Sequence, residues 1–253
     1  MIATLRRNWS LYLIEGWALG MFMISATLFT ILIEHPALPV LTAISSSIVR
    51  RMLIGLAMGT TAVLLIYSPW GRRSGAHMNP AVTLTFLLLR RIALADAVFY
   101  IIAQFVGGLL GMLLVALLLP AYIADPSVGY ITTVPAGVEL WAAFMLEVLI
   151  SFILILTILI VSNSRFANYA GLCAGLLITL YITFEAPNTG MSMNPARTLA
   201  SAIPAHVYTS LWLYFLAPVS GMLSAGLVFR YFYIVHRGHA LDLKLNLNKR
   251  QKQ

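Results

Sequence analysis

A nine-residue phrase occurs twice in this chain, and it restricts the fold more than any other feature. The copies cover residues 75–83 and 190–198, and both read Gly-x-x-Met-Asn-Pro-Ala-x-Thr. A single Asn-Pro-Ala would mean little, because Asn-Pro commonly opens a turn. Two extended copies, one in each half of the chain, indicate a duplicated structure in which each half carries the same local device.

The composition places this duplicated structure in a membrane. Of the 253 residues, 60% are hydrophobic and only 9% are charged, whereas soluble domains carry about 25% charged residues. The first apolar stretch, 9–33, is longer than the roughly 7–15-residue core of a signal peptide and has no clear cleavage site. We therefore interpret this stretch as a retained span of an integral, multi-pass membrane protein.

Six apolar runs approach or exceed the roughly 20 helical residues needed to cross about 30 Å of hydrocarbon. They lie near 9–33, 48–67, 96–119, 138–162, 169–184 and 210–234. Two shorter apolar stretches, 81–89 and 196–203, directly follow the two Asn-Pro pairs and fit re-entrant half-helices. The predicted fold class is therefore all-α, with six transmembrane helices and two re-entrant half-helices.

The duplicated phrase contains a start signal for each half-helix. Pro80 and Pro195 would occupy the first helical position, where a missing N–H costs nothing. Asn79 and Asn194 would cap the helix N-termini. With three spans and one half-helix in each half, the second half must be inverted relative to the first. Inverted repeats of this kind place the working site near the membrane midplane, at the repeat interface.

Basic residues predict the orientation in the membrane. With both termini in the cytoplasm, the cytoplasmic segments carry most of the Lys and Arg, and the segment 120–137 carries none, as the positive-inside rule requires. We expect a plasma (inner) membrane location. The net charge of +8 lies mainly in short loops and in the C-terminal segment, which favours contacts with anionic lipids over binding of nucleic acid.

With these motifs the chain resembles the major intrinsic proteins, the family of aquaporins and glycerol facilitators. The resemblance covers about residues 9–235 and is carried by Ser-Gly-Ala-His-Met-Asn-Pro-Ala-Val-Thr at 74–83 and Met-Asn-Pro-Ala-Arg at 193–197. Gln104, and Ala217-Pro218 with Gly221, also match. The resemblance implies an aquaporin-like channel domain, 1–235, with inverted repeats at about 9–119 and 138–234, and a basic cytoplasmic tail, 236–253.

The resemblance further implies a homotetramer with one pore per subunit, no cofactor and no chemical reaction. The two Asn-Pro-Ala loops would meet at the pore centre, where two positive helix ends repel cations. The amides of Asn79 and Asn194 would donate to a passing water and interrupt proton transfer along the water file; a plain N-cap is the alternative role. The pore-centre residues would be Asn79, Pro80, Ala81, Asn194, Pro195 and Ala196.

Four positions form the narrow filter in this family. By spacing, three of them fall at Ile182, Met191 and Arg197, and the fourth at Met58, with Gly59 as second choice. An arginine inside a membrane segment is expensive and usually functional; snorkelling to the interface is the alternative. Ile182 replaces the His of water-selective members. The predicted filter is apolar, with flexible thioethers that adapt to the shape of a solute.

Three further residues are expected to support the loops. Glu15 and Glu147 precede the Asn-Pro-Ala of their halves, and the resemblance implies that they accept hydrogen bonds from the loop backbones; general acid–base chemistry is the alternative. His77 would shape the cytoplasmic loop or line the inner pore, without partners for a metal. Cys173, the one cysteine, is interpreted as a small apolar residue away from the constriction.

The sequence therefore predicts a passive channel for water and small uncharged solutes such as glycerol that excludes protons and ions. A strictly water-selective channel is one alternative. A secondary transporter of a small neutral solute is another, since transporters also combine inverted repeats with broken helices. Enzyme motifs are absent from the sequence. The expected partners are water, small neutral solutes, membrane lipids and identical subunits, without nucleic acid, metal or cofactor.

Overall fold

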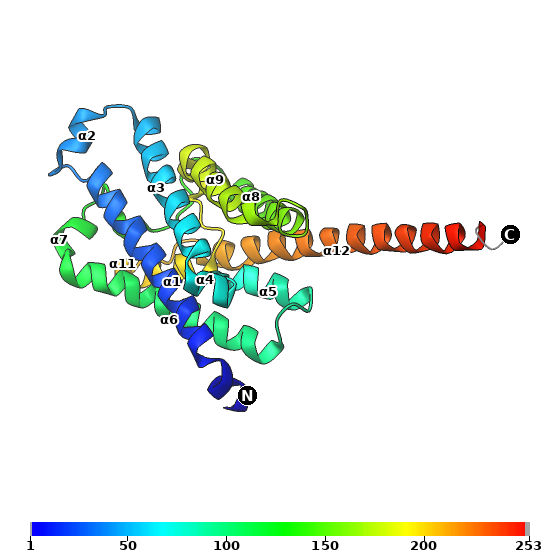
Figure 1. Cartoon of the computed structure of the whole chain (residues 1–253). Coiled ribbons are helices and arrows are strands. Elements are labelled where there is room, and N and C mark those ends of the chain that lie inside the picture. Colours follow the sequence, from blue (N-terminus) through cyan, green and yellow to red (C-terminus); the bar gives the residue numbers. More distant parts are fainter. Residues whose placement is uncertain (1, 251–253) are drawn as a thin grey trace.

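The fold is described from a computed structural model, which defines the backbone of residues 2–250 and the side chains of residues 2–233 (Figure 1). Short 3-10 turns form η1 (Gly129–Ile131) and η2 (Ala167–Tyr169). The α-helices are α1 (Ile2–Glu34), α2 (Pro39–Ala43), α3 (Ser47–Tyr67), α4 (Pro69–Ser74), α5 (Pro80–Leu88), α6 (Leu94–Leu118), α7 (Pro120–Ile123), α8 (Leu140–Ser162), α9 (Ala170–Phe184), α10 (Ala186–Thr189), α11 (Pro195–Ala205) and α12 (Leu211–Arg250).

Six helices are long and apolar enough to cross a membrane, which confirms the predicted number of spans. They are α1, α3, α6, α8, α9 with the preceding turn, and α12 up to Tyr233. Their outward faces carry large apolar side chains, such as Leu64, Leu117 and Trp141, each more than 60% exposed. Such a surface needs an apolar partner, either lipid or another protein, and together with the six spans it shows an integral, multi-pass membrane protein. The predicted tail, 236–253, lies outside the residues whose side chains are described.

The two shorter apolar stretches form the half-helices α5 and α11, as predicted. Each begins with proline, at Pro80 and Pro195, directly after its asparagine. Both half-helices pack against α6 and α12, and with 9 and 11 residues neither is long enough to cross the membrane. Proline has no N–H and a φ angle already suited to a helix, which makes the first helical position favourable for it.

Close helix pairs hold the bundle together. Helix α1 packs along α6, α3 along α9, and α8 along α12. In the first pair the backbones nearly touch: a Cβ atom added to Gly107 would lie 2.0 Å from the carbonyl oxygen of Gly16. In lipid, where apolar burial drives little association, such close packing of small residues is a main source of helix–helix affinity.

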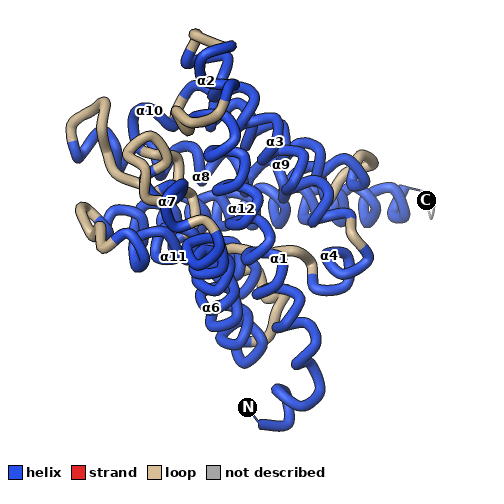
Figure 2. The backbone as a smooth tube through the Cα atoms, turned by 90° about the vertical axis from the view of Figure 1, so that its left-hand side faces the viewer, coloured by secondary structure: helices blue, strands red, loops and turns tan. Residues whose placement is uncertain are grey.

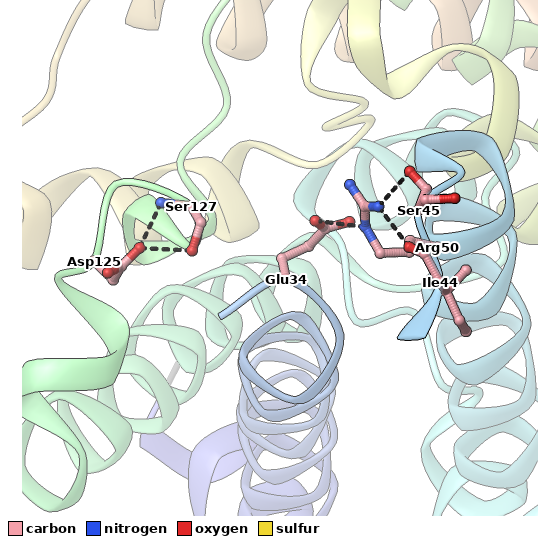
Figure 3. Close-up of polar contacts among 6 residues, drawn as sticks. All are labelled: Glu34, Ile44, Ser45, Arg50, Asp125 and Ser127. Carbon is pink, nitrogen blue, oxygen red and sulfur yellow. Dashed lines mark hydrogen bonds and ion pairs between the residues drawn. The ribbon is translucent and has the colours of Figure 1, made fainter. Parts of the chain in front are cut away.

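The loops and short helices separate into two ends of the bundle. Helices α2, α7 and α10 gather at one end, here called the α2 side, and the N-terminus lies at the other (Figure 2). On the α2 side, Arg50 donates from Nε to Glu34 Oε2 at 3.0 Å and from Nη1 to the carbonyls of Ile44 and Ser45 (Figure 3). Arg50 therefore ties the end of α1 to the α2–α3 connection.

A second loop on the α2 side is fixed by Asp125. Its Oδ1 accepts hydrogen bonds from the hydroxyl and the N–H of Ser127, at 2.6 and 2.8 Å (Figure 3). These bonds lower the pKa of Asp125, because they favour the ionised carboxylate. The loop between α7 and η1 is thereby held in one turn beside the end of α1.

Candidate functional site

The loops that precede the two half-helices have the same unusual backbone. In the first loop Gly75, Ala76 and Met78 have positive φ angles of 93°, 48° and 50°. In the second loop the matching residues Gly190, Met191 and Met193 have φ angles of 81°, 49° and 52°. A side chain in the left-handed region costs about 1 kcal/mol or more per residue. Both loops must therefore be held by other interactions.

In the first loop, the carboxylate of Glu15 supplies these interactions. Oε1 accepts from the Ser74 hydroxyl at 2.7 Å and from the His77 N–H at 3.0 Å, and Oε2 accepts from the Met78 N–H at 2.7 Å. Glu15 is fully buried. Gln104 adds a fourth bond, from Nε2 to Glu15 Oε2 at 2.9 Å.

Glu147 does the same in the second loop. Its Oε1 accepts from the N–H of Ser192 at 2.7 Å and lies 2.8 Å from Thr189 Oγ1, and its Oε2 accepts from the Met193 N–H at 2.9 Å. Charged hydrogen bonds are stronger than neutral ones. Each glutamate therefore fixes one strained loop from a neighbouring span.

Several residues in this framework are not among the sequence-based candidates. Ser74 and Thr189 bridge each glutamate to its loop, and Tyr100 and Tyr214 donate their hydroxyls to the carbonyl oxygens of Ser74 and Thr189, respectively. A signal for the first pair is present in the sequence: a hydroxyl residue precedes the first glycine of both copies, which extends the repeat by one residue.

His77 lies in the loop just before the first half-helix. Its Nδ1 is 3.1 Å from Thr83 Oγ1, and its ring packs near Phe86 and Tyr100. The imidazole also lines the central cavity. Among the described residues, no three His, Cys, Asp or Glu side chains cluster as metal ligands.

The two asparagines meet and join the halves of the chain. Each caps its own half-helix: the Asn79 Oδ1 accepts from the N–H of Ala81, and the Asn194 Oδ1 from that of Ala196. Each also donates across the interface, Asn79 Nδ2 to the Met193 carbonyl at 2.7 Å and Asn194 Nδ2 to the Met78 carbonyl at 2.8 Å. An amide nitrogen carries two hydrogens, so each asparagine keeps one to donate elsewhere.

A cavity of about 490 Å³ runs past these asparagines. Arg91 and Ser162 line its N-terminal end, and Ile131 and Arg197 line its end at the α2 side. Stripes with a spacing of four residues form an apolar wall, since this spacing keeps side chains on one helix face. They comprise Ile54, Met58, Ala62 and Ile66 of α3 and Ala174, Ile178 and Ile182 of α9. The loops 75–79 and 190–194 contribute the polar part of the lining.

All four predicted filter residues line the cavity: Met58, Ile182, Met191 and Arg197. Arg197 lies one turn into α11, and its buried Nη1 has no partner within the described residues. Arg197 also lines the cavity, where guanidinium N–H groups can donate to a passing solute. Met191 is 7% exposed and belongs to the strained second loop.

The register of α3 against α9 distinguishes Met58 from its neighbour Ile54. Gly55 packs between Thr179 and Thr183, one helical turn above the packing site of Gly59. The register therefore sets Ile54 level with Ile182, and Met58 one turn deeper in the cavity. The second choice, Gly59, packs against the backbone of α9 and is not part of the lining.

The cavity runs along a bundle of six spans, and the N-termini of the two half-helices meet beside it. This arrangement is the architecture of a membrane channel. The family model described as major intrinsic protein matches residues 17–229. The chain belongs to this family, whose members are channels rather than enzymes.

Individual relatives agree with this assignment. The chain is 39% identical over 179 residues to aquaporin NIP2-2 of Zea mays, covering 70% of this chain and 58% of that protein. It is 31% identical over 188 residues to aquaporin-4 of Mus musculus, covering 73% and 57%, respectively. The matches thus span a little over half the length of these curated relatives.

The fold also matches a solved structure. An X-ray structure of the aquaglyceroporin from Plasmodium falciparum aligns with a TM-score of 0.74 over 88% of this chain and 95% of that one. The sequence identity of 22% makes this a likeness of fold. It supports the predicted all-α class with six spans and two re-entrant half-helices.

Proposed function

We propose that the protein is a passive channel for water and for small uncharged solutes such as glycerol, and that it excludes protons and ions. The observation that carries the proposal is the pair Asn79 and Asn194, each bound to the opposite loop and each retaining one amide hydrogen beside the cavity. Two fixed donors at one level bind the oxygen of a water or an alcohol.

The same position between the two asparagines also excludes cations and protons. The N-termini of α5 and α11 meet beside the asparagines, and each carries roughly +0.5 elementary charge. A cation or a hydronium ion there meets two positive helix ends in surroundings of low dielectric constant. A water held through its oxygen by two donors cannot also accept a proton from its neighbour. Arg197 adds a full positive charge one turn away.

The residues of the filter favour passage of solutes that are larger and less polar than water. We assign it to Ile54, Ile182, Met191 and Arg197, with Met58 one turn below. Three apolar side chains face one guanidinium, an arrangement suited to a molecule with a carbon skeleton on one side and hydroxyl groups on the other. Met191 adapts to shape because its thioether chain is unbranched and flexible.

Two alternatives make different predictions. A strictly water-selective channel would conduct water without glycerol. A secondary transporter would accumulate its solute against a gradient and would usually need ion-binding acids at the midplane. The buried acids near the centre, Glu15 and Glu147, are already bonded to loop N–H groups, which leaves them poorly placed to coordinate an ion.

Stopped-flow light scattering on proteoliposomes tests the proposal. We expect osmotic water permeability and glycerol permeability above those of protein-free vesicles, with a pH-sensitive dye inside reporting no added proton flux. Fast water flow without added glycerol flux would support the strictly water-selective alternative. Uphill solute uptake driven by an ion gradient would support the transporter.

The setting of the channel is also a proposal. The basic residues support cytoplasmic termini, with the α2 side outside, in a plasma or inner membrane. The inverted repeats form one channel domain, to which the basic segment 236–253 adds contacts with anionic lipid. Membership of the family supports a homotetramer with one pore per subunit, which chemical cross-linking in native membranes would test.

A further inference from the structure

The second half of the chain contains a buried acid that the first half lacks. Glu185 follows α9 directly, one residue beyond the predicted span, and is 8% exposed. The position that matches it in the first copy of the repeat, four residues before the bridging hydroxyl, is Trp70. Glu185 does not belong to the lining of the cavity, and the framework described above does not use it.

Glu185 reaches the framework through Thr189. The Oγ1 atom of Thr189 lies 2.7 Å from Glu185 Oε1 and 2.8 Å from Glu147 Oε1, and it also accepts from the Met191 N–H at 3.1 Å. In the first half, Ser74 Oγ donates to Glu15 alone, at 2.7 Å, and accepts from the Ala76 N–H at 3.1 Å.

These distances cannot be satisfied by two ionised carboxylates. A threonine hydroxyl has one proton and can donate it to one oxygen only. Two bare carboxylate oxygens within hydrogen-bonding distance of the same hydroxyl would leave one contact without a proton and would repel each other. One of the two carboxyl groups must therefore carry a proton and donate it to Thr189.

The surroundings put this proton on Glu185. Glu147 accepts two backbone N–H bonds, from Ser192 and Met193, and these favour its ionised form. The second oxygen of Glu185, Oε2, is buried and has no partner within the described residues. A negative charge there would lack the hydrogen bonds that a buried carboxylate requires.

We propose that Glu185 is a positioning residue of the filter: in its protonated form it donates to Thr189 and so fixes the Thr189–Met191 backbone, and loss of the proton lowers conduction. The proposal rests on the proposed channel function. Thr189 links Glu185 to the N–H of Met191, whose side chain lines the cavity beside Arg197. A change of charge at Glu185 therefore acts on the filter without touching the solute.

The charged and titratable neighbours of Glu185 come from every element around it. Glu147 of α8 and Tyr214 of α12 interact with its charge, and Arg197 of α11 interacts with both of those groups. The Tyr181 carbonyl of α9 accepts the backbone N–H of Glu185, and Arg51 of α3 donates to the carbonyl of Thr183, two residues before it. Burial, together with the charge of Glu147, raises the pKa of Glu185 to about 7. The proton therefore leaves in the neutral range.

The test is the pH profile of conduction in proteoliposomes buffered equally on both sides. We expect the water and glycerol permeability of the wild type to fall severalfold between about pH 6 and about pH 8, roughly one unit either side of the midpoint. Glu185→Gln keeps a neutral donor towards Thr189 and should conduct at the acidic level throughout. Glu139→Gln, an exposed acid on the α2 side, should retain the wild-type profile.

A second measurement does not depend on conduction. The infrared carbonyl band of a neutral carboxylic acid should be present in the wild type near pH 6, disappear as the pH rises, and be missing in Glu185→Gln at both pH values. A flat wild-type profile, a pH dependence that persists in Glu185→Gln, or a neutral-acid band that persists in that variant would overturn the inference. Conduction at the level of protein-free vesicles at every pH would instead overturn the channel function, while the infrared band still tests the protonation of Glu185.

Discussion

Ile54 and Met58 lie one helical turn apart on the same stripe of α3, and the choice between them sets the shape of the filter. The positions of Asn79 and Asn194 can be predicted from the sequence, because each copy of the repeat contains one of them. The proposed choice of Ile54 over Met58 cannot, because counting back from Asn79 crosses α4 (Pro69–Ser74), a short helix whose residues shift the count. Only the packing of Gly55 between Thr179 and Thr183 determines the level.

This assignment predicts different effects for the two positions. Ile54→Phe narrows the cavity at the level of Ile182 and Arg197, so glycerol permeability should fall by roughly tenfold. One methylene group that fits a pocket poorly already changes a rate by about this factor. Water permeability should fall less. Stopped-flow measurements would check both, with Met58→Leu as a control that keeps apolar volume. Loss of glycerol flux in Met58→Phe but not in Ile54→Phe would place the filter one turn deeper.

Cys173 provides a second test at the residue scale. Its side chain is half-buried on α9 and lies outside the lining of the cavity. A mercurial bound there would not enter the path of water. Wild-type channels should therefore keep their water permeability in the presence of mercury chloride. Block of the wild type that disappears in Cys173→Ser would contradict this placement.

At the scale of elements, the spans are predictable and the short helices are not. A run of about 20 apolar residues has few alternatives to a membrane helix, and all six spans agree with the sequence. Helices α4, α7 and α10 have six residues or fewer, too short to show a hydrophobic period. Their positions depend on tertiary contacts, such as the Trp17–Trp70 ring pair with centroids 4.7 Å apart.

The α1–α6 contact predicts which changes a span cannot tolerate. Gly107→Val would push side-chain atoms into the backbone of Gly16, because even a Cβ would lie 2.0 Å from its carbonyl oxygen. We expect a loss of roughly 1–3 kcal/mol or more from overpacking, seen as a lower thermal unfolding midpoint in detergent. Leu110→Val on the same helix, at a side chain that is 60% exposed, should leave the midpoint nearly unchanged. Equal midpoints for the two variants would show that α1 and α6 separate easily.

Across the whole molecule, the two halves agree at the glutamates, the bridging hydroxyls, the strained loops and the asparagines. The repeat in the sequence indicates this symmetry but not the contacts that complete it. Glu15 and Glu147 precede their loops by about 60 and 45 residues, and only folding shows which N–H groups they accept. The symmetry fails at Glu185, whose buried position could not be inferred from a residue at the end of an apolar run.

Because Glu185 is a buried acid without a counterpart in the first half, it predicts how the stability of the folded protein depends on pH. Burial raises the pKa of Glu185 to about 7, while a glutamate in an unfolded chain titrates near ~4.3. The folded protein therefore binds this proton more tightly than the unfolded chain does. The contribution to stability is fully present below about pH 4, declines as the pH rises, and is lost above about pH 7.

At about 1.4 kcal/mol per pKa unit, this group changes the free energy of unfolding by roughly 3–4 kcal/mol between those limits. The measurement is the thermal unfolding midpoint in detergent at about pH 5 and about pH 8. Wild type and Glu139→Gln should lose stability relative to Glu185→Gln as the pH rises, because only the latter lacks the titrating carboxyl. A constant difference between wild type and Glu185→Gln at both pH values would mean that Glu185 keeps one protonation state throughout, and that the filter loop is held without a titrating proton.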